Sequence, residues 1–532
     1  MYKVLVADPM SELGLRQLLL ADDIEVDQST GLSEEELVSI IASYDALLVR
    51  SQTRVTRGIL EAAARLKVIG RAGVGVDNID LEAATRQGVL VTNAPDGNTV
   101  TACEHTWAMM MALARHIPQA YATTVSGRWD RKAFLGVELR HKVLAILGLG
   151  RIGGEVAARA AAFGMKVIGY DPFYTPEQAK QSGVTLASLE EMWQTADFLT
   201  VHTPLTSDTY HLIARPQFES MKRGIRIINC ARGGIIDETA LLDALDEGIV
   251  AGAAFDVLEQ EPPPAEHRLL SHPQVIVTPH LGASTVEAQE HVALDVSEQI
   301  MHILRDQPFD HAVNMPVLSA ELSRRLQPYY QLCEQLGSSI AQMTDGMVSE
   351  VTVSCSGELA ELDMAPLLPY ALKGVLSRTE GYAERRVNAV NAHHVAKELA
   401  IKLHTGEVQI SEYAFSTVTI RLKTELEERW VSGAYAPEAG GRIVRIGPYP
   451  VEIPPEGQLL LISQQDKPGI IGRVGVLLGE AGLNIATMQV GRQEIGGSAV
   501  MILRIDQPPS PEVMASLLAM PDIKRVRQVD FA

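Results

Sequence analysis

Three polar residues follow three successive apolar runs in the middle of the chain: Arg232, Glu261 and His280. The runs have the length and composition of buried parallel strands, and the carboxyl ends of such strands meet at one edge of a sheet. A guanidinium can hold a carboxylate through two hydrogen bonds. An imidazole can accept a proton while a carboxylate orients the ring. We therefore expect Arg232 to be an anion anchor, His280 an acid/base group and Glu261 its partner.

Each of these residues also has a purely structural interpretation. Arg232 could be a solvated loop charge, Glu261 a helix or turn cap, and His280 a buried hydrogen-bonded ring. For any one residue the structural interpretation is preferred, but three residues at successive strand ends favour a site. The stretch NCARGGIIDETA, residues 229–240, places two glycines directly behind Arg232. We interpret them as keeping side chains out of a crowded turn.

A glycine-rich turn between a predicted strand and a predicted helix indicates a dinucleotide site. After the apolar run 143–147, GLGRIGG places glycines at 148, 150 and 153, and the next strand ends in Asp171. Gly148 permits a tight turn, Gly150 lets a pyrophosphate approach the backbone, and Gly153 lets the helix meet the strand. Asp171 would accept hydrogen bonds from ribose hydroxyls and repel a 2′-phosphate, which favours NAD over NADP. The alternative is a glycine-rich turn in an ordinary strand–helix–strand unit.

The elements that must position these groups follow an α/β pattern. Ser33 and Glu36 have the spacing of a capping box at the start of a helix. A second α/β series runs from residue 143 to residue 278, flanked by apolar helices predicted at 102–114 and 287–303. Two such units predict a nucleotide domain inserted into another sheet domain. Strands of the first unit are predicted at residues 2–7, 46–50, 68–70 and 89–92.

The composition changes after residue 316, where a different α+β arrangement is expected. The segment 443–458 is predicted to be an edge strand and a linker, and from 458 a small βαββαβ pattern ends the chain. Helices of the intervening part are predicted at 319–343, 367–376 and 390–403, and strands at 350–356 and 414–422. Strands of the last part are predicted at 459–463, 485–490, 499–505 and 526–530.

Composition and charge exclude several classes of protein. A chain of 532 residues is too long for a single hydrophobic core and predicts about three or four domains. The net charge of −20 argues against broad contact with the nucleic-acid backbone, and no run approaches the ~20 apolar residues of a membrane span. The N-terminal stretch MYKVLVADPM has no targeting pattern, so a cytoplasmic protein is expected. The four cysteines are scattered, and neither a disulfide framework nor a metal site is expected.

Five motifs in one order connect the chain with a known family. They are GRAGVGVDNID at 70–80, GLGRIG, NCARGGIIDETAL, AFDVLEQEP and PHLGAST. Through them, nearly the whole of residues 1–315 resembles the D-2-hydroxyacid dehydrogenases. The resemblance implies Arg232, Glu261 and His280 as the catalytic set. It also implies an NAD-binding Rossmann domain at 98–286, inserted in a flavodoxin-like substrate lobe made of residues 1–97 and 287–315.

The same resemblance implies individual contacts. Cys230 would face the cofactor, and Arg131 would reach the site of a neighbouring subunit. Surface charge is the alternative for each cation. Further cofactor contacts are implied at Arg151, Ile152, Thr203, Asp256, Gly282 and Ala283. Substrate contacts are implied at Arg50, Ser51, Arg71, Asn98, Arg131 and Lys132.

The C-terminal part of the chain narrows the resemblance. Residues 316–455 resemble the intervening, allosteric substrate-binding type domain of the long phosphoglycerate dehydrogenases within this family. Residues 458–532 resemble an ACT domain, a regulatory module that binds amino acids between paired copies. The resemblance implies NAD-dependent oxidation of 3-phospho-D-glycerate to 3-phosphohydroxypyruvate, the first committed step of serine synthesis. A homotetramer with paired ACT domains is also implied.

Feedback by serine is the expected role of the ACT domain. Gln464, Asp466 and Asn484 match positions that bind serine in relatives, with Asn484 contributed by the paired copy. Gln464 departs from the aromatic or histidine side chain of some relatives, and a purely structural dimer module is the alternative. For the enzyme as a whole, the alternatives are another 2-oxoacid oxidoreductase, such as one reducing 2-oxoglutarate, or a non-catalytic NAD-sensing regulator.

Overall fold

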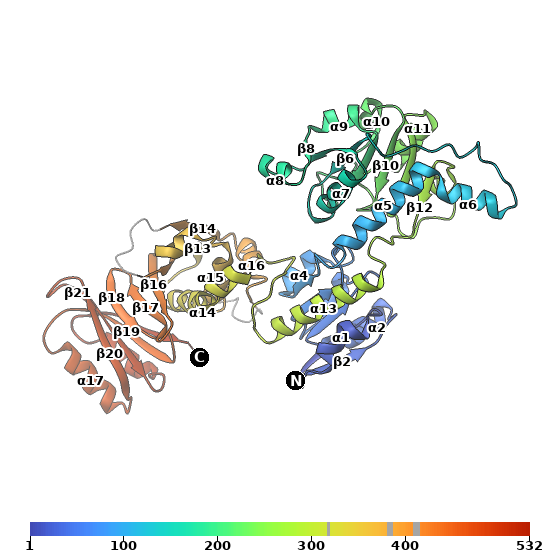
Figure 1. Ribbon diagram of the computed structural model, residues 1–532. Coiled ribbons are helices and arrows are strands. Elements are labelled where there is room, and N and C mark those ends of the chain that lie inside the picture. Colours follow the sequence, from blue (N-terminus) through green and yellow to red (C-terminus); the bar gives the residue numbers. More distant parts are fainter. Residues whose placement is uncertain (317–319, 380–386, 408–414, 532) are drawn as a thin grey trace.

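The computed structural model describes residues 1–316, 320–379, 387–407 and 415–531. Their strands form four sheets, which follow one another as separate layers along the molecule (Figure 1). The two sheets of the N-terminal half are wholly parallel, and the two of the C-terminal half are mixed or antiparallel. The predicted combination of two α/β units with an α+β part and a βαββαβ module is confirmed.

The first sheet has five parallel strands in the order β2-β1-β3-β4-β5. This is the strand order of flavodoxin-like folds, as predicted. Helices α1 and α13 cover one face, and α2, α3 and α4 cover the other, so apolar strands such as β3 are buried throughout. The strands are β1 (Tyr2–Val6), β2 (Ile24–Gln28), β3 (Ala46–Val49), β4 (Val68–Arg71) and β5 (Leu90–Asn93). The helices are α1 (Glu12–Leu19), α2 (Glu34–Ile40), α3 (Arg57–Ala62), α4 (Leu81–Gln87) and α13 (Val286–Leu304).

The second sheet has seven parallel strands in the order β12-β11-β10-β9-β6-β7-β8, which contains the doubly wound order of a Rossmann domain. Helices α5 and α7 pack on one face, and α9 to α12 pack on the other. Its strands are β6 (Val143–Leu147), β7 (Lys166–Tyr170), β8 (Thr185–Leu186), β9 (Phe198–Val201), β10 (Ile225–Asn229), β11 (Val250–Phe255) and β12 (Val275–Val277). Its helices are α5 (Thr99–Arg115), α6 (Ile117–Val125), α7 (Arg151–Ala162), α8 (Pro176–Gln181), α9 (Leu189–Thr195), α10 (Arg215–Ser220), α11 (Glu238–Asp246) and α12 (Arg268–Ser271).

The chain crosses between these two sheets twice, just before α5 and just before α13 (Figure 1). The crossings lie side by side, because the Oγ1 atoms of Thr101 and Thr285 are 3.1 Å apart. Thr285 also caps α13 by accepting a hydrogen bond from the backbone N–H of Ala288. The predicted insertion of one sheet domain into the other is therefore confirmed, and the two are joined by a narrow double connection.

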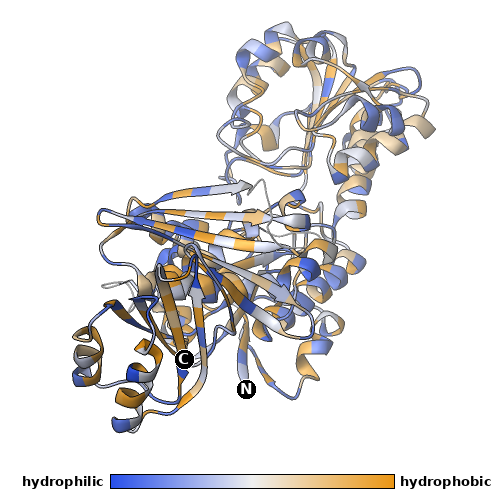
Figure 2. Ribbon diagram, turned by 90° about the vertical axis from the view of Figure 1, so that its left-hand side faces the viewer, coloured by the Kyte–Doolittle hydropathy of each residue, from blue (hydrophilic) through white to orange (hydrophobic). Residues whose placement is uncertain are grey.

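The third sheet has the order β14-β13-β15-β16-β17-β18, and only the pair β13–β14 is parallel. Helix α14 packs across it, and buried and exposed residues alternate in the second half of β15. Figure 2 shows hydrophobic and hydrophilic residues interleaved along the strands of the molecule. The strands are β13 (Val348–Ser356), β14 (Lys402–Glu407), β15 (Thr417–Thr424), β16 (Glu428–Ala436), β17 (Gly440–Ile446) and β18 (Tyr449–Ile453). The helices are α14 (Ala320–Met343), α15 (Leu368–Leu376) and α16 (Ala392–Glu398), with 3₁₀ turns at Gly357–Glu361 and Ala365–Leu367.

The sequence prediction was wrong in parts of this third sheet. The helix predicted at 390–403 ends at Glu398, since Ala400 has a positive φ of 55° and the next residues pair with β13 as β14. The segment 443–458, predicted as an edge strand and a linker, contains the end of β17, the edge strand β18 and a short connection to β19. Strand β16 was not predicted; it pairs with β17, and β16 to β18 form an antiparallel meander. Gly433 lies in β16 of that meander, where α14 packs closely on the strand. A Cβ at this position would lie 2.9 Å from the Leu336 side chain of α14. The predicted strand 414–422 begins outside the described residues, and its described part is β15.

The fourth sheet has the antiparallel order β20-β21-β19-β22, with two helices on one face. This is the predicted βαββαβ module. Its strands are β19 (Gln458–Gln465), β20 (Ile485–Arg492), β21 (Ser498–Ile505) and β22 (Ile523–Asp530), and its helices are α17 (Ile470–Glu480) and α18 (Pro511–Leu518). In the part of the chain that the structure describes, no helix is both long and apolar enough to cross a membrane.

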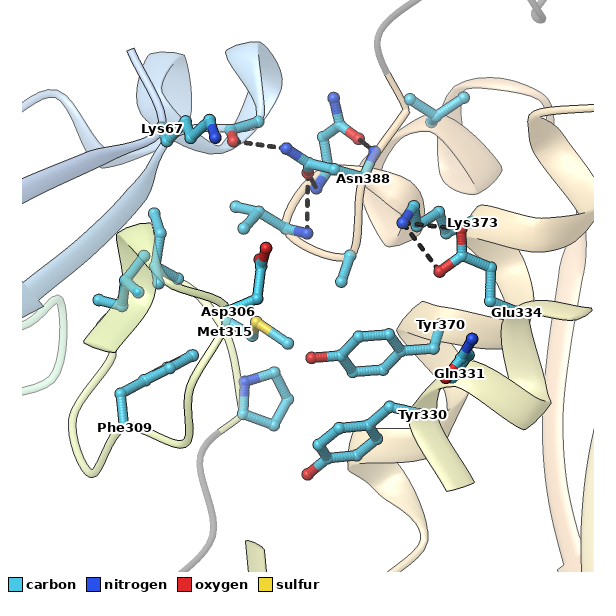
Figure 3. A pocket seen from close by; sticks show the side chains of 18 of the residues that line it. Lys67, Asp306, Phe309, Met315, Tyr330, Gln331, Glu334, Tyr370, Lys373 and Asn388 are labelled. Carbon is cyan, nitrogen blue, oxygen red and sulfur yellow. Dashed lines mark hydrogen bonds and ion pairs between the residues drawn. The ribbon is translucent and has the colours of Figure 1, made fainter. Parts of the chain in front are cut away.

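A cavity of about 1800 Å³ separates the first sheet from α14 and α15 (Figure 3). Lys67 lines it on one side, and the stacked rings of Tyr330 and Tyr370 line it on the other. At its edge Asn388 donates a 2.7 Å hydrogen bond to the carbonyl oxygen of Gly88, which ends α4. None of the predicted reacting residues lines this cavity, so it is distinct from the site at the second sheet.

Candidate active site

The three predicted reacting residues lie at the carboxyl edge of the second sheet, after the adjacent strands β10, β11 and β12. Nδ1 of His280 is 2.7 Å from Oε2 of Glu261. Burial alone would raise the pKa of Glu261, but the hydrogen bond and positive charge of His280 outweigh it and lower that pKa. The ring is half exposed, so Nε2 is the nitrogen that can face a ligand. The geometry brings an oriented imidazole to the sheet edge.

The loop that carries Glu261 is hydrogen-bonded to Glu238, the first residue of α11. The backbone N–H of Leu258 donates to Oε1 of Glu261 at 3.0 Å, and that of Glu259 donates to Oε1 of Glu238 at 2.8 Å. Glu238 is buried, and its other oxygen accepts from Nε2 of His267 at 2.9 Å. Burial raises the pKa of Glu238. The sequence prediction did not single out this residue, although it lies in the stretch that contains Arg232.

Of the two glycines behind Arg232, Gly233 is crowded as predicted, whereas the nearest atom to a Cβ on Gly234 would be 3.5 Å away. A Cβ on Gly233 would lie 2.0 Å from the carbonyl oxygen of Leu258, and Gly234 has a φ of +81°. Asn229 closes the turn by donating from Nδ2 to the carbonyl oxygen of Arg232 at 2.9 Å. Only glycine fits at position 233, because any side chain there would displace the loop that leads to Glu261.

The Arg232 side chain reaches the loop after β4 of the first sheet. Its Nε lies 3.1 Å from Oδ2 of Asp77, and its Nη2 lies 2.0 Å from where a Cβ on Gly75 would be. Both residues belong to the loop after β4, whose carbonyl at Val74 accepts a 2.6 Å hydrogen bond from Asn93. Asp77 was not predicted as a site residue, and its presence in the motif GRAGVGVDNID is the signal that could have found it.

Two predicted substrate arginines lie near Arg232. Arg71 ends β4, and its pKa is lowered to about 10 by burial and by the charges of Arg232 and Arg50. Within the described residues, the buried Nε of Arg71 has no hydrogen-bond partner. Arg50 follows β3 and donates from its backbone to Oδ2 of Asp8 at 2.5 Å and from Nη1 to the carbonyl oxygen of Pro9 at 3.3 Å. Clustered guanidinium groups of this kind suit a ligand with more than one anionic group.

The remaining predicted substrate residues are less uniform in position. Ser51 is exposed directly after Arg50. Asn98 precedes α5, and its Oδ1 is buried without a hydrogen-bond partner. Arg131 and Lys132 are exposed in the segment after α6, with Arg131 5.9 Å from the centre of the Trp129 ring. Within one chain, the described contacts of Arg131 and Lys132 are local and do not join them to the cleft arginines.

The glycine-rich turn has the geometry that a dinucleotide requires. Gly148 has a φ of +93°, and a Cβ on Gly153 would lie 2.0 Å from the carbonyl oxygen of Gly148. Nothing lies within 4 Å of a Cβ position on Gly150, which leaves open space at the start of α7. Asp171 follows β7, and its carboxylate accepts from the backbone N–H groups of Leu149 and Phe173, each at 2.9 Å. The turn and the acidic residue are thus held together.

Other predicted cofactor residues surround this turn. Oγ1 of Thr203 is buried without a hydrogen-bond partner, as expected of a group that awaits a ligand. Nε of Arg151 forms a 2.5 Å ion pair with Asp96 of the substrate lobe, and Ile152 is part-buried in the first turn of α7. Cys230 is buried, which raises the pKa of its thiol. Ala283 is part-buried after β12.

Asp256 lies beneath the turn after β12 rather than open to the cleft. Its side chain is fully buried, and its Oδ2 accepts from the backbone N–H of Gly282 at 2.7 Å. Its Oδ1 lies 3.0 Å from Nε2 of His105, a residue on α5 that the prediction did not include. Burial would raise the pKa of Asp256, but the hydrogen bonds from His105 and Thr278 outweigh it and lower that pKa.

The predicted effector residues of the fourth sheet lie at its two opposite ends. Gln464, near the end of β19, is buried with its Oε1 unpartnered, and Asp466 accepts from Arg492 at 3.0 Å. Asn484 precedes β20 and donates to Asp506 at 2.8 Å. Gln464 pairs with Ala499 near the start of β21, whereas β20, which follows Asn484, begins opposite Ile505 at the end of β21. At ~3.3 Å per residue along β21, roughly 20 Å separates Gln464 from Asn484. One chain alone does not bring these residues together.

Comparison with known families agrees with this organisation. Residues 107–282 match the family model described as D-isomer specific 2-hydroxyacid dehydrogenase, NAD binding domain. Residues 325–447 match the D-3-phosphoglycerate dehydrogenase intervening domain, and residues 458–522 match the ACT domain. The three matches correspond to the second, third and fourth sheets.

Relatives match over the full length of the chain. The D-3-phosphoglycerate dehydrogenase of Bacillus subtilis is 44% identical over 532 residues, covering 100% of both chains. The chain belongs to the D-3-phosphoglycerate dehydrogenase family. Another member, from Methanocaldococcus jannaschii, is also 44% identical over 100% of both chains.

Among solved structures, the TT0316 protein of Thermus thermophilus is 34% identical with a TM-score of 0.54. That match covers 58% of this chain and 99% of the Thermus chain. A share of this size is expected when the Thermus protein corresponds to the part of this chain that contains the first two sheets. The apo-structure of D-lactate dehydrogenase from Escherichia coli is 26% identical with a TM-score of 0.52, and it covers 58% of this chain and 99% of that chain.

Proposed function

We propose that the protein oxidises 3-phospho-D-glycerate at C2 to 3-phosphohydroxypyruvate with NAD, the first committed step of L-serine biosynthesis. The observation that carries the proposal is the cluster at the carboxyl edge of the second sheet. There, His280 is hydrogen-bonded to Glu261, and the positive charges of Arg232 and Arg50 are close enough to Arg71 to lower its pKa. Membership of the family agrees with this activity.

The proposed chemistry assigns one task to each side chain. Nε2 of His280 accepts the proton of the C2 hydroxyl, and Glu261 holds the ring through Nδ1–H and stabilises the imidazolium that forms. Arg232 holds the substrate carboxylate, which takes the place of Asp77 on the guanidinium. Arg71 and Arg50 provide positive charge for the phosphate. NAD, when bound, supplies the acceptor for the hydride.

The residues present fit a dinucleotide, and we propose NAD rather than NADP. Open space at Gly150 leaves room for a pyrophosphate at the start of α7, and the buried Oγ1 of Thr203 has no hydrogen-bond partner among the described residues. Asp171 stands directly after β7, where a carboxylate accepts from ribose hydroxyls and repels a 2′-phosphate. Support for Cys230 and the 282–283 turn as cofactor contacts is their position at the same sheet edge, and buried Asp256 would act through that turn, because its carboxylate accepts from the N–H of Gly282.

We further propose four domains with distinct tasks. Residues 1–97 with 287–315 bind substrate, and 98–286 bind cofactor. Residues 316–455 form the intervening domain, and 458–532 form an ACT domain that binds serine. The separation of Gln464 and Asp466 from Asn484 supports a site completed by a second copy. The role of Arg131 and Lys132 at a neighbour's site, a tetramer with paired ACT domains and a cytoplasmic location stay predictions.

Initial rates of NADH formation test the activity. We expect turnover with 3-phosphoglycerate, little with lactate or 2-hydroxyglutarate, and a strong preference for NAD over NADP. The variant His280→Ala should lose turnover and keep cofactor affinity. A preference for lactate would refute the substrate assignment, and near-normal turnover by His280→Ala would refute the role of the histidine. Rates that serine does not change would remove the effector proposal alone.

A further inference from the structure

His105 connects the helix between the two domains with the turn that carries His280. It lies on α5, shortly after the chain crosses from the substrate lobe. Its Nε2 is 3.0 Å from Oδ1 of Asp256 and 3.2 Å from Oγ1 of Thr278. The side chain of His105 is 18% exposed and that of Asp256 is 0% exposed, so the contact is an interior one.

Asp256 is the acceptor that orders the turn after β12. Its backbone oxygen accepts from the N–H of His280 at 2.9 Å. Its Oδ1 accepts from the N–H of Leu281 at 2.8 Å and from Oγ1 of Thr278 at 2.5 Å, and its Oδ2 accepts from the N–H of Gly282 at 2.7 Å. Three consecutive backbone N–H groups, from residues 280 to 282, therefore donate to one residue.

This ordering matters because His280 adopts an unfavourable backbone conformation. Its φ is +56°, in the left-handed region, which costs a non-glycine residue on the order of 1–2 kcal/mol. Such conformations persist where the surrounding structure fixes them. In this conformation Nδ1 of His280 reaches Oε2 of Glu261 at 2.7 Å. The hydrogen bonds to Asp256 thus determine where the imidazole points.

A buried carboxylate needs donors or a cation to remain in place. Among the described residues, the donors to the Asp256 carboxylate other than His105 belong to the turn itself, at Thr278, Leu281 and Gly282. His105 is the donor that comes from another element, and α5 packs against β10, β11 and β12. Without the His105 contact, the Asp256 carboxylate and the turn of residues 278–282 are free to shift together relative to α5.

We infer that His105 is a positioning residue for this reaction: by anchoring Asp256 to α5, it holds the backbone of 280–282 and so the orientation of His280. The inference rests on the proposed function in so far as His280 is the base. It adds a side chain on the interdomain helix to the machinery of the site, and it assigns that side chain no contact with substrate.

The test compares three variants of the full-length enzyme. His105→Ala removes the contact, and His105→Gln restores a side-chain N–H donor. Glu104→Ala is the matched control, because Glu104 is exposed and adjacent on the same helix. We expect kcat to fall about tenfold or more in His105→Ala and to return to within about threefold in His105→Gln. The KM for phosphoglycerate should change by less than about twofold, and any rise in the Kd for NADH, whose proposed contacts include the 282–283 turn, should be smaller than the fall in kcat.

A second readout does not depend on turnover. Hydrogen exchange, measured by mass spectrometry on a peptide covering residues 279–284, reports the amides that donate to Asp256. We expect exchange of these amides to accelerate about tenfold in His105→Ala and to stay near wild type in Glu104→Ala. If the wild-type enzyme did not oxidise phosphoglycerate, the proposed function would fail, and the exchange data would still decide the inference.

Several results would overturn the inference. These are unchanged kcat and unchanged exchange in His105→Ala, a loss of kcat that His105→Gln does not restore, and a loss equal to that of Glu104→Ala. A change confined to KM or to the Kd for NADH would assign His105 to ligand binding instead. A thermal melt of each variant establishes that the compared proteins are folded.

Discussion

Replacing Gly233 with alanine should uncouple the catalytic carboxylate from its histidine without touching either side chain. The new Cβ would lie 2.0 Å from the carbonyl oxygen of Leu258, 2.2 Å from its carbonyl carbon and 2.7 Å from the N of Glu259. All three are backbone atoms, so no flexible side chain can swing away. The loop that leads to Glu261 has to move.

The size of this movement follows from the contact distances. Ordinary van der Waals contact of a Cβ begins at 3.4 Å, so the carbonyl of Leu258 must retreat by about 1.4 Å. Leu258 also donates its backbone N–H to Oε1 of Glu261, and the other carboxylate oxygen is 2.7 Å from Nδ1 of His280. A shift of ~1 Å in catalytic geometry costs on the order of 100-fold, equivalent to about 2.7 kcal/mol of activation free energy.

The assay is kcat with saturating phosphoglycerate, together with the Kd for NADH and a thermal melt. Gly233→Ala should lower kcat about 100-fold and leave cofactor affinity near wild type, because the glycine-rich turn at 148–153 is a separate segment. Gly234→Ala is the control: its φ of +81° makes alanine strained, but the nearest atoms are 3.5 Å away. The control should keep kcat within about threefold.

Two results would refute this reasoning. One is a Gly233→Ala enzyme with kcat within about threefold of wild type, which would show that the loop yields without moving Glu261. The other is an equal loss of kcat in Gly234→Ala, which would attribute the effect to strain of the turn in general.

Further predictions concern charge and the joint between domains. Because the pKa of Arg71 in the free enzyme is about 10, kcat/KM for phosphoglycerate should fall above that pH as the guanidinium loses its proton; Arg71→Gln should lack this alkaline limb and have a raised KM throughout. Asp171→Ala should raise kcat/KM with NADP relative to NAD, and an unchanged ratio would argue that other groups select the cofactor. Asn388→Ala should remove the hydrogen bond to Gly88, which contributes about 1 kcal/mol to the contact between the N-terminal and C-terminal halves of the chain, and should leave basal kcat unchanged. The melting transitions of the two halves should then separate in calorimetry, and coincident transitions would contradict a role of this hydrogen bond in coupling the halves.

The local rules of the sequence determined much of the fold before any packing was known. The capping box at Ser33 and Glu36 is present at the start of α2, and the glycines at 148 and 153 have the strained turn and the close contact that their spacing predicted. Apolar runs bounded by turn residues became parallel strands, because a strand buried on both faces requires an uninterrupted apolar segment. Predictions failed mainly in the third sheet, where no strand was predicted at residues 428–436, which form β16.

Those failures have a physical cause in long-range packing. Gly433 and its neighbours form a strand because α14 covers them and β15 and β17 pair on either side, and none of these contacts is local in sequence. The helix predicted through residue 403 ends early because parallel pairing with β13 satisfies the backbone of β14. Local propensity is weaker than a full ladder of sheet hydrogen bonds together with burial.

The same division applies to the site. The sequence alone determined which side chains could do the chemistry, because Arg232, Glu261 and His280 each follow a strand of one parallel sheet. Only the tertiary structure decided what holds them: Asp77 reaches Arg232 from 155 residues away in the chain, and His105 reaches the turn of His280 from another helix. The position of a residue in the sequence shows at which end of which strand it lies. Partners brought in from other elements depend on how helices and lobes pack, and that is a property of the folded chain as a whole.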